Sequence, residues 1–100
     1  MSNRITIKML EARVNYLNQA LGYPTEQWKP YKIDGRLSSN PYHYYVGKAY
    51  GGYRLEQIAN TGGGAHDISP RGTKREIWDY VTAMIAGVAA ARDISRGMRF

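Results

Sequence analysis

The chain contains no cysteine, and this absence excludes several classes of function at once. Without thiols it can have no disulfide scaffold, no thiolate nucleophile and no cysteine-ligated zinc site. It also lacks an apolar run approaching the roughly 18 residues that a membrane-spanning helix needs, and its first residues lack the apolar core of a signal peptide. These absences predict a protein of the cytoplasm with no membrane partner.

Acidic residues are few compared with basic ones. Eight Asp and Glu stand against 14 Lys and Arg, which gives a net charge of +6 and a pI near 9.7. Such a balance favours anionic partners, whether nucleic acid, nucleotides or an acidic protein surface. The basic residues are scattered along the chain, so a nucleic-acid-binding tail is not indicated. One hundred residues predict a single domain, residues 1–100, too small for a deep cavity.

A first helix is predicted over residues 7–21, where apolar residues recur at alternating spacings of three and four. Thr6 can serve as its N-cap, and Gly22 stands where a left-handed residue commonly ends a helix. The Gly is followed closely by Pro24, which cannot continue the helix.

A second helix is predicted to begin at Thr73, because Thr73 and Glu76 have the spacing of a capping box. An apolar stripe at helical spacing follows it as far as Val88. Residues 92–100 are basic and are predicted to form a loosely ordered tail.

Four to five short strands are predicted between the helices, at residues 31–33, 36–38, 42–50, 53–60 and 65–69. Asp34-Gly35 and Gly51-Gly52 are the expected two-residue turns. Trp28, in the preceding connection, is expected to cover one end of the core. The predicted fold is therefore α+β, with an N-terminal helix, an antiparallel β-meander and a C-terminal helix, both helices lying on one face of the sheet.

Tyrosine is unusually frequent, with nine in the chain, and the strand at residues 42–50 is the richest segment. One face of this strand carries Tyr42, Tyr44, Val46, Lys48 and Tyr50, and the other carries His43, Tyr45, Gly47 and Ala49. The second face is small enough to pack under a helix. The aromatic face could stack on bases or could be an ordinary half-buried sheet surface.

Two segments are candidate phosphate sites. The consecutive glycines Gly62, Gly63 and Gly64 could bring backbone amides close to an anion. Lys74 and Arg75 lie in the first turn of the second helix, where free N–H groups also attract anions. A flexible connection and two solvated side chains are the plain alternatives.

No catalytic or metal site can be assembled from the sequence. His66 and Asp67 are adjacent, so their side chains on a strand would point apart, and spacing supplies no further ligand. His66 is therefore expected to contact a ligand rather than to catalyse or to bind a metal, and no cofactor is implied.

The run YVGKAYGGYRLEQIANTGGGAHDI, followed by GTKREIWDYVTAMIAG, resembles a family of small phage and prophage proteins, the phage anti-Thoeris sponge proteins. The resemblance covers roughly residues 42–87. It implies a dimer or hexamer that sequesters cyclic ADP-ribose isomers and, in some members, cyclic oligonucleotides, without degrading them. It also implies that Tyr50 stacks on the base, Asn60 reads the base or ribose, and Arg75 contacts the phosphates. Arg36 is the candidate for a further arginine expected upstream.

The sequence therefore predicts a non-catalytic homo-oligomer that binds a small anionic cyclic nucleotide where Tyr50, Asn60, the glycine loop and Lys74/Arg75 meet. The alternatives are a basic phage protein that binds nucleic acid through the aromatic face, and one that inhibits a host protein through exposed tyrosines.

Overall fold

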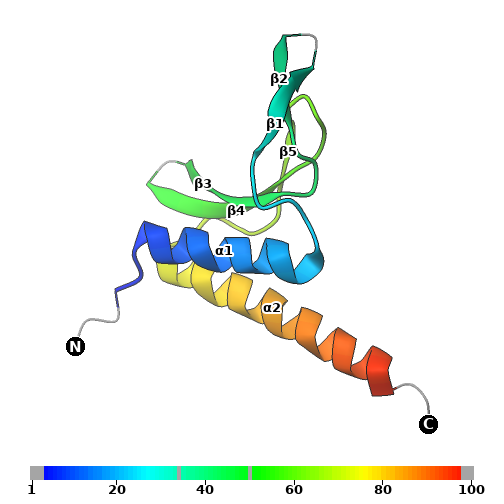
Figure 1. The fold of residues 1–100 in the computed structure, drawn as a ribbon. Coiled ribbons are helices and arrows are strands. Elements are labelled where there is room, and N and C mark those ends of the chain that lie inside the picture. The colour runs from blue at the N-terminus through cyan, green and yellow to red at the C-terminus, as the bar shows by residue number, and fades with distance from the viewer. Residues whose placement is uncertain (1–3, 34, 50, 98–100) are drawn as a thin grey trace.

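The computed structural model describes residues 4–33, 35–49 and 51–97. Along the chain, the elements are α1 (Ile7–Leu21), β1 (Trp28–Ile33), β2 (Arg36–Ser39), β3 (Tyr44–Ala49), β4 (Gly52–Ile58), β5 (Ala65–Asp67) and α2 (Lys74–Gly97). This order confirms the predicted α+β class, with a helix at each end and the strands between them (Figure 1).

The bounds of α1 are those predicted, because both of its caps form. Thr6 Oγ1 accepts a hydrogen bond from the Met9 amide at 3.1 Å. Gly22 adopts φ 74°, and its amide donates to Gln19 O at 3.1 Å. A non-glycine residue would be strained in that left-handed conformation, so Gly22 ends the helix.

The capping box of α2 also forms. The Glu76 amide donates to Thr73 Oγ1 at 3.1 Å, and the Thr73 amide donates to Glu76 Oε1 at 3.0 Å. The far end differs from the prediction, because residues 92–97 continue the helix instead of forming a loose tail. The alanines at 89–91 are strong helix formers, and the Arg92 guanidinium donates to Ala20 O near the end of α1. Residues 98–100 lie outside the described part of the chain.

The strands form two sheets rather than the single sheet predicted. β1 and β2 make an antiparallel hairpin, and β3, β4 and β5 make an antiparallel sheet in that order. The hairpin stands away from the helices, as Figure 1 shows. The two sheets separate because Pro41 lacks an amide to continue the pairing and Tyr42 adopts φ 74°, which turns the chain. Trp28 belongs to this hairpin and is 45% exposed, so the prediction that it covers the core is wrong.

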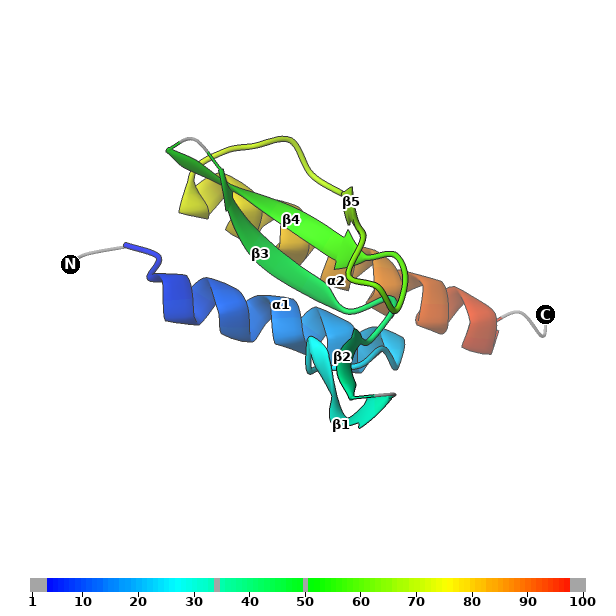
Figure 2. The same ribbon diagram turned by 90° about the horizontal axis from the view of Figure 1, so that it is seen from above.

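Both helices lie on the same face of the β3–β4 sheet, as predicted (Figures 1 and 2). Buried apolar side chains from the helices, from β4 and from the residue two positions before α1 form the core: Ile5, Leu10, Val14, Leu17, Leu55, Ile77 and Val81. Tyr44 and Val46 pack against this core, so the aromatic face of β3 faces the helices. The prediction that the smaller face packs there is wrong, because burying a tyrosine and a valine removes more apolar surface from water.

The register also corrects the second predicted turn. Gly52 pairs with Ala49 and is therefore the first residue of β4, not a turn residue.

Candidate functional site

Within one chain, the predicted binding residues that the structure describes fall into separate groups. Asn60 and the glycine loop follow the end of β4, whereas Lys74 contacts the ring of Tyr53 near its beginning. β4 has 7 residues, and at about 3.3 Å per residue the two groups lie roughly 20 Å apart. Arg36 begins β2 at the tip of the projecting hairpin (Figure 1). Tyr50 lies outside the described residues.

Asn60 organises the glycine loop. Its Oδ1 accepts hydrogen bonds from the amides of Gly62 at 3.0 Å and Gly64 at 3.2 Å. The Gly63 amide donates to the Asn60 carbonyl at 3.2 Å. The three glycine amides are therefore satisfied inside the loop, and in this conformation none of them is available to a phosphate.

His66 is exposed on β5, where it pairs with Gln57 of β4. Among the described residues, no three His, Asp or Glu side chains gather as a metal site.

Lys74 and Arg75 lie at the opposite end of β4, in the first turn of α2. The Lys74 ammonium stands 5.9 Å from the centroid of the Tyr53 ring, which fits a cation–π contact. Arg75 is half exposed, and its guanidinium lies 4.0 Å from the Asp79 carboxylate one turn later.

A shallow hollow of about 210 Å³ lies beside this helix start. Its lining is rich in glycine and backbone and consists of Gly51, Gly52, Arg71, Gly72, Thr73 and Glu76. None of these lining residues was predicted from the sequence to contact a ligand, and Arg71 is the one among them that carries a positive charge.

Arg71 is the basic residue that lines this hollow, and further basic residues stand on the segments that begin or end at the same end of the molecule. α1 and α2 begin at the same end of the molecule, where the β3–β4 connection also lies (Figures 1 and 2). The basic residues on these segments are Arg4 and Lys8 at the start of α1, Lys48 near the end of β3, and Arg71, Lys74 and Arg75 at the start of α2. We call this set the basic end.

The outer face of the sheet, turned away from the helices, carries a charge network that the sequence did not reveal. Tyr45 donates its hydroxyl to Glu56 Oε1 at 3.3 Å, and Arg54 Nε lies 3.2 Å from Asp67 Oδ1. Burial, followed by the charge and hydrogen bond of Glu56, raises the pKa of Tyr45. A Cβ on Gly47 would lie 1.6 Å from Glu56 Oε2, so only glycine lets Glu56 lie flat across the strand.

The tyrosines predicted to stack on bases do not form one exposed surface. Tyr44 packs on the core and lies 6.0 Å, ring to ring, from Tyr23. Tyr42 is 61% exposed, but it precedes β3 and lies 5.6 Å from the same Tyr23 ring. These three tyrosines form a cluster at the end of α1, not a platform for successive bases.

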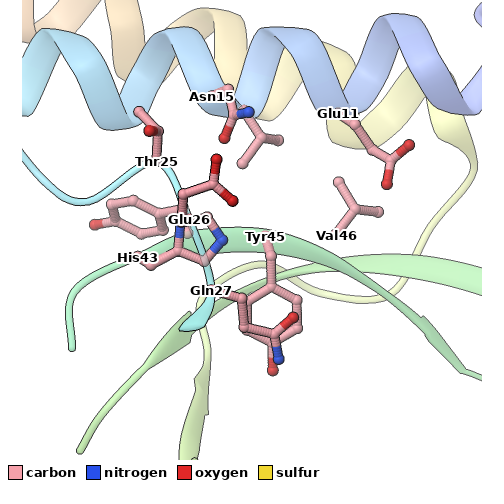
Figure 3. Close-up of a pocket in the computed structure, with 10 residues that line it drawn as sticks. Glu11, Asn15, Thr25, Glu26, Gln27, His43, Tyr45 and Val46 are labelled. Atoms are coloured by element: carbon pink, nitrogen blue, oxygen red, sulfur yellow. The ribbon is translucent and has the colours of Figure 1, made fainter. Parts of the chain in front are cut away.

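A groove of about 290 Å³ runs between α1 and the edge of β3 (Figure 3). Glu11 and Asn15 project into it from α1, while Glu26 and His43 lie at one end. His43 is buried, and its Nδ1 lies 2.8 Å from the Pro24 carbonyl, which can only accept. This contact places the imidazole proton on Nδ1, so the 3.4 Å approach of Asn18 Nδ2 to the same atom is packing rather than a hydrogen bond.

No helix in the described ranges is both long enough and apolar enough to cross a membrane. Comparison with protein families, curated proteins and solved structures gave no match to this chain.

Proposed function

We propose that this protein is a non-catalytic sponge that binds and sequesters a small anionic cyclic nucleotide, a cyclic ADP-ribose isomer or a cyclic oligonucleotide, in the cytoplasm of a host cell. The observation that carries the proposal is the basic end. Arg71 lines a hollow rich in glycine and backbone at the start of a 24-residue helix, Lys74 and Arg75 stand in the first turn of that helix, and the helix dipole there also favours negative charge.

The first turn of α2 also offers backbone donors to a phosphate. Thr73 and Glu76 use their amides on each other's side chains. The amide of Lys74, the first residue of α2, points out of the helix start, because the first amides of an α-helix lack a helical carbonyl four residues back. Lys74 can therefore contribute both a charged side chain and a backbone donor, and Arg75 contributes its guanidinium.

The hollow is small for the proposed ligand. Ligand pockets commonly measure about 300–1,000 Å³, against about 210 Å³ here. A whole cyclic nucleotide would need further walls, and a second copy of the chain would supply them. The proposed state is therefore a homo-oligomer, a dimer or a hexamer.

The direct test is a thermal-shift screen with cyclic ADP-ribose isomers, cyclic di- and trinucleotides and short single-stranded DNA. A ligand at 100 times its Kd adds about 2.7 kcal/mol of stability, which raises the Tm of a domain of this size by at least about 10 °C. Mass spectrometry of the ligand released by denaturation should recover it intact. A degraded ligand would refute the non-catalytic role.

Matched variants locate the site. Arg75→Ala removes a phosphate contact, and truncation of a buried charge contact costs about 2–5 kcal/mol, or more than tenfold in Kd. Lys32→Ala removes one positive charge from the exposed hairpin and should leave Kd nearly unchanged. Equal Kd values for the two variants would remove the basic end from the proposal.

Inhibition of a host protein is a second candidate, and the hairpin supports it. Large apolar side chains are exposed there, with Trp28 at 45%, Tyr31 at 59% and Leu37 at 56%. Aromatic side chains of this kind commonly dominate binding energy at protein interfaces. If this is the function, a host protein co-purifies with the wild type and is lost with Tyr31→Ala, while no nucleotide raises the Tm.

A further inference from the structure

The edge of β3 beside the α1 groove is open for pairing. Ile58 N donates to His43 O at 3.0 Å, which places the backbone groups of residues 45, 47 and 49 toward β4 as well. The alternating residues Tyr44, Val46 and Lys48 therefore direct their N–H and C=O groups away from β4. Tyr44 and Val46 line the groove, and Lys48 continues the same edge beyond it.

One of these three positions is already paired by a side chain. The Tyr44 amide donates to Asn18 Oδ1 at 2.8 Å, and Asn18 Nδ2 donates to the Tyr44 carbonyl at 3.0 Å. The Asn18 amide thus substitutes for the peptide group of a neighbouring strand. Within the described ranges, the outward backbone groups of Val46 and Lys48 have no such partner.

The groove is also acidic in a basic protein. Most carboxylates in the described part of the chain have partners: Glu56 and Asp67 at Arg54, Asp79 at Arg75, Glu76 in the cap of α2, and Asp93. The two that have no ion pair or hydrogen bond among the described residues are Glu11 and Glu26. Both line this groove (Figure 3).

We propose that the groove between α1 and β3 binds an extended protein segment bearing lysine or arginine, which adds to β3 as a further strand. The open edge recognises the backbone of the segment, because a pairing strand needs N–H and C=O groups at alternate residues. The carboxylates of Glu11 and Glu26 select basic side chains, and Val14 and Val46 supply an apolar floor. This surface is distinct from the hollow at the start of α2, although Lys48 belongs both to the β3 edge and to the basic end, and the proposal does not depend on nucleotide binding.

A defined peptide tests the proposal. The probe is an acetylated and amidated eight-residue peptide that alternates threonine and lysine, titrated into ¹⁵N-labelled protein. The amides of Val46 and Lys48 should shift and exchange with solvent more slowly as the peptide binds. Shifts confined to other surfaces, or no binding at millimolar peptide, would overturn the proposal.

Two control peptides separate backbone pairing from charge. Replacing every lysine of the probe by glutamate should abolish binding if the groove carboxylates select the side chains. N-methylation of alternate residues, which removes the donors of one edge, should also abolish it. Undiminished binding of either control peptide would refute the corresponding half of the proposal.

Protein variants provide matched comparisons. Glu11→Gln and Glu26→Gln should each weaken probe binding roughly two- to fivefold, as expected for exposed ion pairs, while Asp93→Asn on α2 should not. Lys48→Pro removes one outward N–H without touching the ladder to β4, and proline is tolerated at such edge positions. It should bind the probe roughly two- to tenfold more weakly than Lys48→Ala, the loss expected for a backbone hydrogen bond.

A small organic cation is the competing occupant. If spermidine perturbs the surroundings of Glu11 and Glu26 and excludes the probe, while Val46 and Lys48 gain no protection with either compound, the groove is a cation site and strand addition is refuted.

Discussion

Asn18 is the residue whose replacement most sharply tests this description of the fold. It is fully buried, and its amide is bonded to both backbone groups of Tyr44 at 2.8 Å and 3.0 Å. Asn18→Ala leaves the Tyr44 amide and carbonyl without partners, where packing against α1 limits access by water. The connection between α1 and β3 therefore depends on one polar side chain.

The cost follows from two lost hydrogen bonds. A buried donor or acceptor left without a partner costs about 1–3 kcal/mol. With two groups affected, Asn18→Ala should lower the free energy of unfolding by about 2–5 kcal/mol. Domains are stable by only about 5–15 kcal/mol, so the variant should lose at least about 8 °C in Tm and stand close to the limit of folding.

Urea unfolding followed by circular dichroism measures this loss of stability. An unchanged m-value verifies that both proteins expose the same amount of surface on unfolding. Gln19→Ala is the matched control, since the neighbouring Gln19 is exposed on α1 and its replacement should change stability by less than about 0.5 kcal/mol. A loss for Asn18→Ala no larger than that of the control would show that the paired amide does not hold β3.

The variant Asn18→Asp should have a free energy of unfolding that depends on pH. The introduced carboxylate, when ionised, could accept from the Tyr44 amide, but it would repel the Tyr44 carbonyl and be buried as a charge, so its folded pKa should lie above its unfolded value. A raised folded pKa means stability that is fully present below the unfolded pKa, near 3.9, and lost as pH rises through the folded pKa. The deficit relative to wild type should therefore be smallest in acid. A deficit independent of pH would contradict the assigned contact with the carbonyl.

Further predictions concern α2 and the outer face of the sheet, and urea unfolding tests each. Gly87→Ala should stabilise the protein by about 0.5–1 kcal/mol, because Gly87 is exposed in α2 with open space around its Cα; destabilisation would indicate an unrecognised close contact. Thr73→Ala should cost about 1 kcal/mol by removing the cap, whereas Thr82→Ala, on the exposed surface of the same helix, should not. The raised pKa of Tyr45 contributes stability that is present below its unfolded pKa, near 10, and is lost as pH rises through the folded value. Wild type should therefore lose stability above that pH more steeply than Tyr45→Phe, and parallel curves would refute the assigned cause.

Local signals predicted the helices well because their ends are set by neighbouring residues. Thr6, Gly22 and the Thr73 capping box each act within one helical turn, so a short stretch of sequence contains the whole interaction. The far end of α2 was missed because no comparable stop signal exists near residue 92, and Arg92 is held by α1, which is distant in sequence.

The buried face of β3 and the charge network of the sheet depend on contacts between residues distant in sequence, so local patterns could not predict them. The face of β3 that packs on the helices depends on Asn18 and on its register with β4, and alternation alone treats both faces alike. The network of Tyr45, Arg54, Glu56 and Asp67 likewise needs the strand register before its charges become neighbours. Asn60 was predicted to contact a ligand; its observed hydrogen bonds are to its own loop, and its contact with a ligand stays a prediction.

The separation of the glycine loop from Lys74 and Arg75 constrains how the proposed ligand could be held. Two groups at opposite ends of β4, roughly 20 Å apart, exceed the reach of one cyclic nucleotide, and β4 is a central strand that cannot shorten. A ligand that touches both groups must therefore touch them on different chains.

If Asn60 acts only within its own loop, the basic end of each chain would instead bind its ligand without a contact from Asn60. Mixing Arg75→Ala chains with Asn60→Ala chains distinguishes these two arrangements. If each site is shared between two chains, the mixed oligomer regains some binding, because some sites combine the intact Asn60 of one chain with the intact Arg75 of another. Under the second arrangement, Asn60→Ala alone leaves Kd unchanged, and the mixture binds as the average of its components.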